Sequence, residues 1–232
     1  MEFGTSDYYV VGELIACWGA FLICVNTVLS YALYDRRQRY FLYAALSTFF
    51  ASFFNMLSAY NIKNYTEFSH FTCTLITTLY FFTLLICPFI MTCYVCELTI
   101  QNEKKRKIFN SVVGIIQTLY FIIVIINCKT GWIFHFDDEA GYVRGPLKNI
   151  TYILSAVYGL TIVITTIIQR KKLARRIFWV FLLYPFVSIY FIAIQFFFPK
   201  VLLTGVASFT AVLFAYMTFS LTQWTSILKQ DF

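Results

Sequence analysis

Long apolar stretches alternate with short polar clusters along the whole chain. Seven mostly apolar stretches of about twenty residues or more cover 8–34, 40–60, 68–98, 108–127, 147–168, 174–198 and 201–224. A helix needs about 20 apolar residues to cross the hydrocarbon core of a bilayer. The pattern therefore predicts an all-α membrane protein built as a bundle of seven transmembrane helices.

The composition agrees with this prediction. Of the 232 residues, 60% are hydrophobic and only 12% are charged. The charged fraction is about half that of a typical soluble domain. We therefore expect a multi-pass protein of the cell (plasma) membrane whose outer surface contacts lipid.

The basic residues are distributed unevenly between the two ends of this predicted bundle. Most of the 18 Lys and Arg residues fall at one end, namely Arg36, Arg37, Arg39, Lys104, Lys105, Arg106, Lys107, Arg170, Lys171, Lys172, Arg175, Arg176 and Lys229. The other end keeps Lys63, Lys129, Arg144, Lys148 and Lys200. Because basic loops are retained in the cytoplasm, we expect the N-terminus outside and the C-terminus in the cytoplasm. The net charge of +7 then reflects topology, and we expect no nucleic-acid partner.

A polar insertion, TGWIFHFDDEAGYVRGPL, separates the fourth and fifth apolar stretches. Trp132, Phe134 and Phe136 recur at every second position, which is the period of a β-strand. The DDEAG run supplies turn-forming residues, and Pro146 suits the first position of a following helix. The pattern predicts a short extracellular β-hairpin, residues 130–146, that covers the mouth of the bundle with its aromatic side.

Several function classes lack the residues that they require. Within the apolar stretches, the acidic residues Glu13 and Glu97 lie near the two ends, and no charge lies at mid-depth. Proton pumps and ion-coupled transporters need ionisable residues along their pathway, and covalent retinal needs a lysine that the last stretch does not contain. The chain has no His-x-x-x-His pair, phosphate loop or nucleophile elbow. We therefore expect neither an enzyme nor a cofactor.

A metal site would have to use the two histidines, His70 and His135, with Asp137 or Asp138. Two histidines far apart in sequence are more often polar surface residues, so we expect no metal. Cys73 and Cys128 both fall on the outer side, and a disulfide between them is geometrically conceivable. Pro88 and Pro185 lie in mid-span, where proline favours a kink.

Polar and aromatic residues are concentrated in the outer half of the predicted bundle. Such a concentration fits a small-molecule pocket that opens outward, although polar side chains also hydrogen-bond one another between helices. The candidate ligand-binding residues are Glu13, Trp18, Asn55, His70, Tyr152 and Gln195 in the bundle and Trp132, Phe134, Tyr142 and Arg144 in the hairpin.

Small residues recur along the last apolar stretch at spacings of four and three. They are Thr204, Ser208, Ala211, Ala215, Thr218 and Thr222. Small residues allow helices in lipid to pack closely, so one interpretation is simply a packed face. The other is that the stripe, which continues past the inner membrane boundary, transmits a rotation or piston motion to the cytoplasm.

The hairpin also carries a family resemblance. NCKTGWIFHFDDEAGYVRGPL resembles the hairpin of the N-terminal seven-helix sensor regions of bacterial histidine kinases and GGDEF diguanylate cyclases. The matching positions are Asn127, Thr130, Gly131, Phe134, Tyr142, Arg144, Gly145, Pro146 and Leu147. The passage FFFPKVLLTGVASFTAVLFAYMTFSLTQ is similar to the sixth loop and seventh helix of those regions, and SILKQDF is similar to the start of the linker that leads to a GGDEF domain.

This resemblance implies a sensor domain over residues 1–224 and the start of a cytoplasmic linker at 225–232, with the output domain absent from this chain. It also implies a homodimer. The expected function is a receptor-like sensor that binds an unknown small extracellular molecule and signals through its last helix. A small-solute transporter and a non-signalling membrane subunit remain the alternatives.

Overall fold

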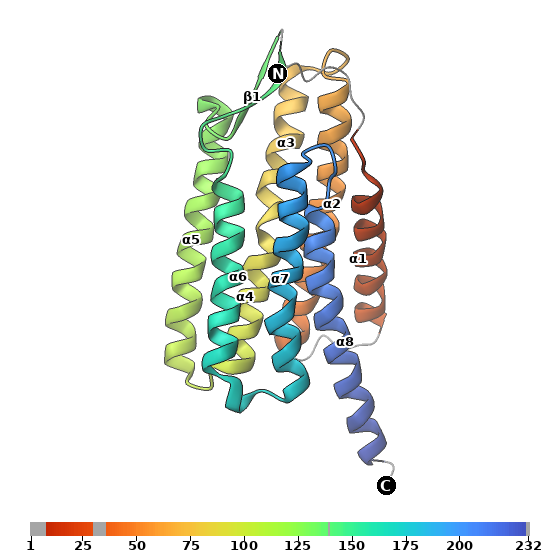
Figure 1. Ribbon diagram of the computed structural model, residues 1–232, viewed down its shortest axis with the longest axis vertical. Coiled ribbons are helices and arrows are strands. Elements are labelled where there is room, and N and C mark those ends of the chain that lie inside the picture. Colours follow the sequence, from red (N-terminus) through yellow and green to blue (C-terminus); the bar gives the residue numbers. More distant parts are fainter. Residues whose placement is uncertain (1–7, 30–35, 139, 231–232) are drawn as a thin grey trace.

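The computed structural model describes the backbone of residues 8–29, 36–138 and 140–230, and the side chains of 8–29, 38–138 and 140–217. The described chain is a bundle of long helices with one two-stranded sheet at its end (Figure 1). The helices are α1 (Val11–Leu29), α2 (Arg36–Lys63), α3 (His70–Leu84), α4 (Ile86–Thr99), α5 (Glu103–Thr130), α6 (Ile150–Ile168), the 3₁₀ turn η2 (Arg170–Lys172), α7 (Arg175–Phe197) and α8 (Thr204–Gln230). The strands are β1 (Phe134–Asp137) and β2 (Gly141–Arg144).

Each predicted apolar stretch contains helix, as expected. Six helical segments are long and apolar enough to cross a membrane when α3 and α4 are taken together, and Thr204–Met217 of α8 forms a shorter apolar segment. The mostly helical character of the chain is thus confirmed, and the length and composition of the helices are consistent with a membrane protein.

The helices form a ring in which α1, α2, the α3–α4 pair, α6, α7 and α8 follow one another, and α8 closes the ring against α1. Helix α5 lies outside this ring, beside α3 and α4. Helix α1 approaches α8 closely because two of its positions are glycine. A Cβ on Gly12 would lie 2.9 Å from Val206 Cγ2, and a Cβ on Gly19 would overlap the ring of Phe209.

The third predicted span is divided into two helices at Leu85. Pro88 lies in the first turn of α4 and has no N–H to donate to the carbonyl of Leu84, so the helical hydrogen-bond ladder is interrupted there. Pro185 behaves differently, because α7 continues through it as one helix from Arg175 to Phe197.

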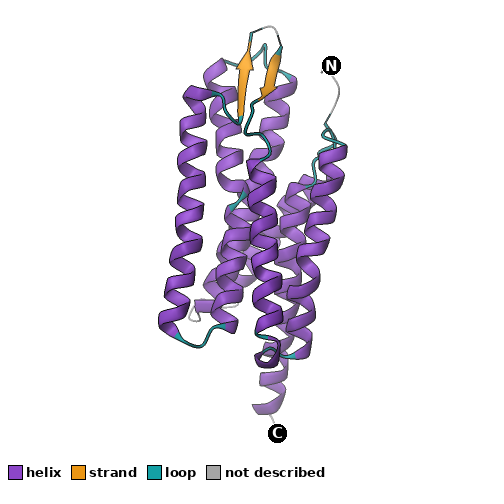
Figure 2. Cartoon of the chain, turned by 60° about the vertical axis from the view of Figure 1, so that its left-hand side comes forward, coloured by secondary structure: helices purple, strands orange, loops and turns teal. Residues whose placement is uncertain are grey.

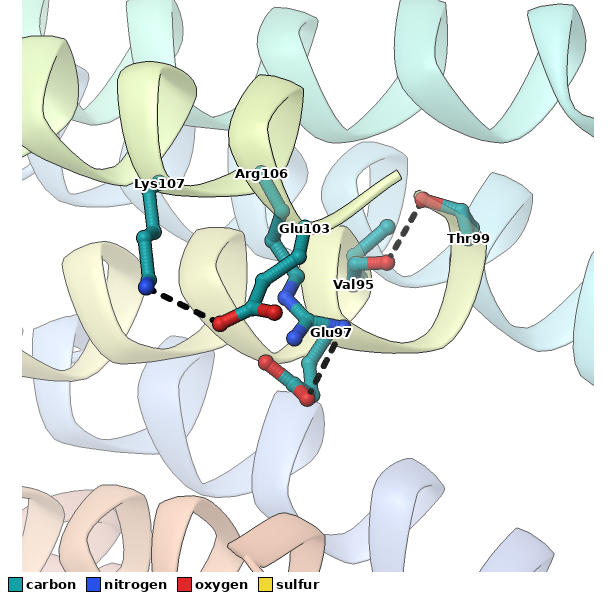
Figure 3. Close-up of polar contacts among 6 residues, drawn as sticks. All are labelled: Val95, Glu97, Thr99, Glu103, Arg106 and Lys107. Atoms are coloured by element: carbon teal, nitrogen blue, oxygen red, sulfur yellow. Dashed lines mark hydrogen bonds and ion pairs between the residues drawn. The ribbon is translucent and has the colours of Figure 1, made fainter. Parts of the chain in front are cut away.

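The segments with most basic residues all lie at the end of the bundle opposite the hairpin (Figure 1). At this end Arg106 of α5 pairs with Glu97 of α4 at 3.3 Å, and Lys107 pairs with Glu103 at 2.9 Å (Figure 3). The Lys107 pair is exposed, and such pairs contribute about 0–1 kcal/mol. The Glu97 pair is mostly buried and joins the two helices across their short connection.

The predicted hairpin is present as an antiparallel pair at one end of the bundle (Figure 2). Phe134 pairs with Arg144 and Phe136 with Tyr142, and the Asp137 carboxylate accepts a hydrogen bond from the N–H of Ala140 at 3.0 Å. Gly141 follows with a φ of 68°, a conformation that glycine adopts without strain. The turn chemistry therefore agrees with the sequence.

The prediction that strand alternation begins at Trp132, with Trp132 on the same face as Phe134 and Phe136, is wrong. Trp132 is 44% exposed, whereas Ile133 is buried together with Phe134 and Phe136. The cause is Asn127, whose side-chain oxygen accepts hydrogen bonds from the N–H groups of Ile133 and Phe134 and whose amide donates to the Phe134 carbonyl. These bonds hold the start of the hairpin in a turn, so strand alternation begins only at Phe134.

All seven cysteines are free. Cys73 is buried beside the hairpin core, whereas the Cys128 thiol is exposed and lies 3.5 Å from the Thr78 hydroxyl. The conceivable disulfide between Cys73 and Cys128 is therefore not formed in this structure.

Candidate functional site

A cavity of about 300 Å³ lies between the hairpin and the ring of helices. Its walls come from α2, α3, α6, the end of α7, the connection to α8, the hairpin and Tyr8. Its aromatic residues are Tyr8, Tyr80, Phe81, Tyr142, Tyr152 and Phe196, and its uncharged polar residues are Asn55, Ser58, Thr77, Asn149, Thr151 and Gln195. Arg144 and Lys148 are the charged residues of the lining, and no acidic residue belongs to it among the described part of the chain.

The mouth of the cavity combines positive charge with tyrosine hydroxyls. Arg144, at the end of β2, and Lys148 are exposed at this mouth. Burial raises the pKa of Tyr8 and of Tyr142, and the nearby Arg144 guanidinium partly opposes each shift. Both hydroxyls therefore stay neutral near pH 7 and can donate hydrogen bonds to an anion.

The floor of the cavity is organised around the hydroxyl of Thr204, the first residue of α8. This hydroxyl accepts a hydrogen bond from the Asn55 amide at 3.1 Å, lies 3.3 Å from the Tyr80 hydroxyl and donates to Glu13 Oε1 at 3.4 Å. Asn55 and Tyr80 both line the cavity. Thr204, at the beginning of α8, thus connects the cavity-lining residues Asn55 and Tyr80 with Glu13 of α1.

Glu13 is fully buried at the N-terminus of α8. Its Oε1 atom accepts a hydrogen bond of 2.8 Å from the N–H of Gly205. The first N–H groups of a helix have no partner within the helix, and the helix dipole favours an acidic group there. Glu13 of α1 therefore caps α8, a role that the side chain of the residue at the start of a helix usually has.

The residue at position 205 must be glycine for this cap to form. A Cβ on Gly205 would overlap both Glu13 Oε2 and Ser52 Oγ. Neither of these two oxygen atoms makes a hydrogen bond of good geometry to a described residue. The absence of a side chain at Gly205 thus lets the carboxylate approach the helix N-terminus.

Two further contacts hold the connection that leads into α8. The backbone N–H of Tyr9 donates to the Lys200 carbonyl at 2.9 Å, and the N–H of Leu202 donates to the Tyr9 carbonyl at 3.2 Å. Gln195, which lines the cavity, accepts a hydrogen bond from the N–H of Leu203 at 2.7 Å. The beginning of α1 and the end of α7 therefore both position the start of α8 beside the cavity.

A second, smaller cavity of about 60 Å³ lies deeper in the bundle between α4, α6, α7 and α8. It shares Leu84, Thr151 and Tyr152 with the larger cavity and is also lined by Thr204. Both cavity volumes are the space open to the centre of a water-sized sphere, and one water molecule needs about 10–15 Å³ of such space. The smaller cavity therefore has room for a few waters or for the end of an elongated ligand.

Half of the residues predicted from sequence to bind a ligand line the larger cavity. These are Asn55, Tyr142, Arg144, Tyr152 and Gln195. Glu13 lies behind the floor, in contact with Thr204. The structure therefore brings these six residues together at the hairpin end of the bundle.

The remaining four predicted residues lie elsewhere. Trp18 is 61% exposed on the outward face of α1, and Trp132 is exposed on the hairpin. His70 contacts the Phe136 carbonyl at 3.0 Å through Nε2 and so attaches the hairpin to α3. Phe134 is 1% exposed and stacks on the cavity residue Phe81 at a ring distance of 5.3 Å, so it supports the wall from behind.

Other residues of the lining were not predicted from the sequence, among them Tyr8, Ser58, Tyr80, Phe81 and Lys148. A usable signal did exist for Ser58. Polar residues recur along α2 at spacings of three and four, and all are buried, namely Thr48, Ser52, Asn55, Ser58 and Asn61. A polar stripe at helical spacing inside an apolar helix indicates a face turned toward the bundle interior.

The small-residue stripe of α8 lies at a packed face over its described part. Thr204, Ala211 and Ala215 are buried, and Ser208 is partly buried. The side chains of Thr218 and Thr222 lie outside the described residues. Among the residues described, no group of three His, Cys, Asp or Glu side chains could hold a metal ion.

No model of a protein family, no curated protein and no solved structure matches this chain. The chemistry of the cavity must therefore indicate function by itself. It offers positive charge, hydroxyl and amide groups and aromatic faces around one cavity that opens at the hairpin end. This combination suits the binding of a small molecule.

Proposed function

We propose that this protein is a membrane-embedded, receptor-like sensor that binds a small ligand in the cavity under the hairpin and transmits the state of that cavity through α8. One observation carries the proposal. The Thr204 hydroxyl, at the first residue of α8, contacts the cavity-lining residues Asn55 and Tyr80. A ligand that bonds either of these residues therefore competes directly with a contact to α8.

The shape of α8 favours transmission over the length of the bundle. The helix has 27 residues, which corresponds to about 40 Å at 1.5 Å per residue. It begins at the cavity and extends beyond the other helices at the far end (Figure 1). A displacement of its first turn can thus reach the opposite end of the molecule.

The charge distribution supports an orientation with the hairpin outside the cell. The basic segments lie at the end opposite the hairpin (Figure 1), and basic loops are retained in the cytoplasm. Apolar side chains such as Ile115, Leu119 and Ile122 of α5 are exposed along the bundle, where lipid would cover them. The resemblance to kinase and cyclase sensor regions suggests a homodimer and a cytoplasmic output domain, and no enzymatic role or cofactor is proposed for this chain itself.

The experiment joins residue 232 to the catalytic domain of a diguanylate cyclase and measures cyclic dinucleotide output in cells. A panel of soluble metabolites is added outside the cells. Asn149→Trp places a large ring at the exposed part of the cavity lining. We expect at least one metabolite to change the output of the parent fusion and to lose its effect in Asn149→Trp.

Lys129→Trp is the matched control, because Lys129 is exposed at the same end and does not line the cavity. This variant should respond like the parent. A response that survives in Asn149→Trp, or the same loss in both variants, would contradict the proposal. Accumulation of a labelled metabolite in liposomes that contain the purified chain would favour the transporter alternative.

A further inference from the structure

We infer that the ligand of this cavity is a small aromatic carboxylate, which places its carboxylate beside Arg144 and Lys148 and its ring among the tyrosines. The inference rests on the proposed function, because it names the ligand class of the same cavity. It is carried by charge, hydrogen-bonding capacity, wall chemistry and size.

The part of the cavity lining that the structure describes carries two positive charges and no negative charge. Arg144 and Lys148 line the cavity, and no carboxylate within the described part of the chain forms an ion pair with either of them. Glu13, which contacts Thr204 behind the floor, is engaged by the N-terminus of α8 and does not belong to the lining. An anion would supply the missing negative charge, whereas an organic cation would be repelled at the mouth.

The hydroxyl groups near the mouth add neutral donors. Tyr8, Tyr142 and Tyr152 line the same cavity as Arg144, and the Arg144 charge partly opposes the rise in pKa that burial causes at Tyr8 and Tyr142. No hydrogen bond joins any of these hydroxyls to another described residue. A carboxylate has two oxygens that accept several hydrogen bonds, and charge-assisted bonds to Arg are about twice as strong as neutral ones.

The walls behind the mouth favour a flat, apolar body. Six aromatic residues line the cavity. The ring centroids of two of them, Tyr80 and Phe81, lie 5.2 Å apart at its inner side. Aromatic rings pack favourably on one another at centroid distances of about 4.5–7 Å. A ring that enters between Tyr142, Tyr152 and Phe196 would find such partners on several sides.

The volume suits a ligand with one ring. The cavity of about 300 Å³ is at the lower end of small-molecule pockets. A carboxylate on a single aromatic ring fits this volume.

The experiment measures binding to the purified full chain in detergent by isothermal titration calorimetry, with thermal unfolding as a second readout. Four probes separate the contributions. Phenylacetate carries the proposed charge and ring, phenylacetamide replaces the charge by a neutral group of similar shape, phenethylamine reverses the charge, and cyclohexylacetate keeps the charge but lacks the aromatic ring.

We expect phenylacetate to bind about tenfold or more tightly than phenylacetamide, since a charge-assisted hydrogen bond contributes that much. Phenethylamine should bind least, and cyclohexylacetate should bind more weakly than phenylacetate by a few-fold. Arg144→Gln should weaken phenylacetate about tenfold while leaving phenylacetamide unchanged. Lys148→Gln should act in the same direction.

Lys129→Gln is the matched control, because it removes a positive charge at the same end outside the cavity. It should leave phenylacetate binding unchanged. Three results would overturn the inference: no binding of phenylacetate to a chain that unfolds cooperatively, equal affinity for the acid and the amide, or equal losses in Lys129→Gln and Arg144→Gln.

These outcomes are separable from the proposed function. If the purified chain prefers phenylacetate as expected but the cyclase fusion does not respond to it, the ligand class stands and the sensor proposal is contradicted. If the fusion responds to phenethylamine and not to phenylacetate, the sensor proposal stands and the ligand class is contradicted.

Discussion

Replacing Gly205 by alanine tests the contact between α1 and the beginning of α8. The new methyl group would overlap Glu13 Oε2 and Ser52 Oγ. The Ser52 hydroxyl can rotate about χ1, but the Glu13 carboxylate can leave only by giving up its hydrogen bonds to Gly205 and Thr204. We therefore expect Gly205→Ala to detach Glu13 from α8 and to destabilise the bundle.

The magnitude follows from two contributions. Overpacking a closely packed site costs about 1–3 kcal/mol. Interhelical hydrogen bonds of membrane proteins contribute about 0.6–1.7 kcal/mol each, and two of them are lost. The free energy of unfolding should thus fall by about 3 kcal/mol, which for a chain of this size lowers the unfolding midpoint by about 6–12 °C.

A thiol-reactive fluorescent dye can follow this change, because six of the seven cysteines are buried and react only on unfolding. Gly114→Ala is the matched control. Gly114 lies within α5, and nothing lies within 4 Å of a Cβ at that position. Alanine there should raise stability by about 0.5–1 kcal/mol, because glycine is unfavourable within a helix.

A double-mutant cycle isolates the proposed collision. Glu13→Ala removes the carboxylate that the methyl group would meet, so adding Gly205→Ala to Glu13→Ala should cost about 1–2 kcal/mol less than adding it to the parent. Equal costs in both backgrounds, or a Gly205→Ala chain as stable as Gly114→Ala, would refute the reasoning.

Three further predictions concern the hairpin, the helix ends and the topology. Asn127→Leu leaves the N–H groups of Ile133 and Phe134 without their acceptor and should cost about 2–4 kcal/mol in the same unfolding assay; a loss below about 0.5 kcal/mol would show that Asn127 does not hold the hairpin start. Asn102 caps α5 through the N–H of Lys105 at 3.1 Å, whereas Asn149 makes no side-chain cap bond to α6. Asn102→Ala should therefore cost about 1 kcal/mol and Asn149→Ala should cost less, and equal losses would contradict this difference. The exposed thiol of Cys128 lies at the hairpin end, so a membrane-impermeant maleimide should label it on intact cells and not in Cys128→Ser; labelling only after permeabilisation would show that this end faces the cytoplasm.

The helical fold was predictable because a membrane-spanning helix needs about 20 mostly apolar residues in a row, and a single segment of sequence shows whether it has them. Each span is recognisable from its own residues, without knowledge of its neighbours. The division of the third span at Leu85 follows from the missing N–H of Pro88, and yet Pro185 leaves α7 continuous. The effect of a proline thus depends on the packing around it, which a local pattern does not contain.

The hairpin shows where local periodicity stops being sufficient. Its turn residues and its strand pair agree with the sequence, but Trp132 lies outside the alternation because Asn127, in the preceding helix, binds the next two N–H groups. This asparagine was part of the family resemblance, although its role was not evident from sequence. A side chain that caps a neighbouring segment acts through tertiary geometry.

The lining of the cavity was predictable in part, because the position of a residue along its own helix or strand can be read from the sequence. Asn55, Tyr142, Arg144, Tyr152 and Gln195 are polar or aromatic residues near the hairpin end of their elements, and this position alone places them near the cavity. Trp18 has the same depth and chemistry, but it lies on the opposite face of its helix. Depth in the bundle can be estimated from sequence, whereas the direction of a side chain depends on which helices pack against it.

The link between the cavity and α8 depends entirely on tertiary packing. Glu13 and Gly205 are separated by 192 positions, and neither residue alone indicates that they meet. A ligand can shift an equilibrium between two states only by the difference in its interactions with them. If the ligand acts by replacing the contacts of Asn55 and Tyr80 with Thr204, two hydrogen bonds of about 0.5–1.5 kcal/mol each are available. The resulting coupling of about 1–3 kcal/mol corresponds to a change of roughly 5–150-fold in the balance between two states. Such a range is sufficient for a signalling response, and the contacts that supply it all lie at the first turn of α8.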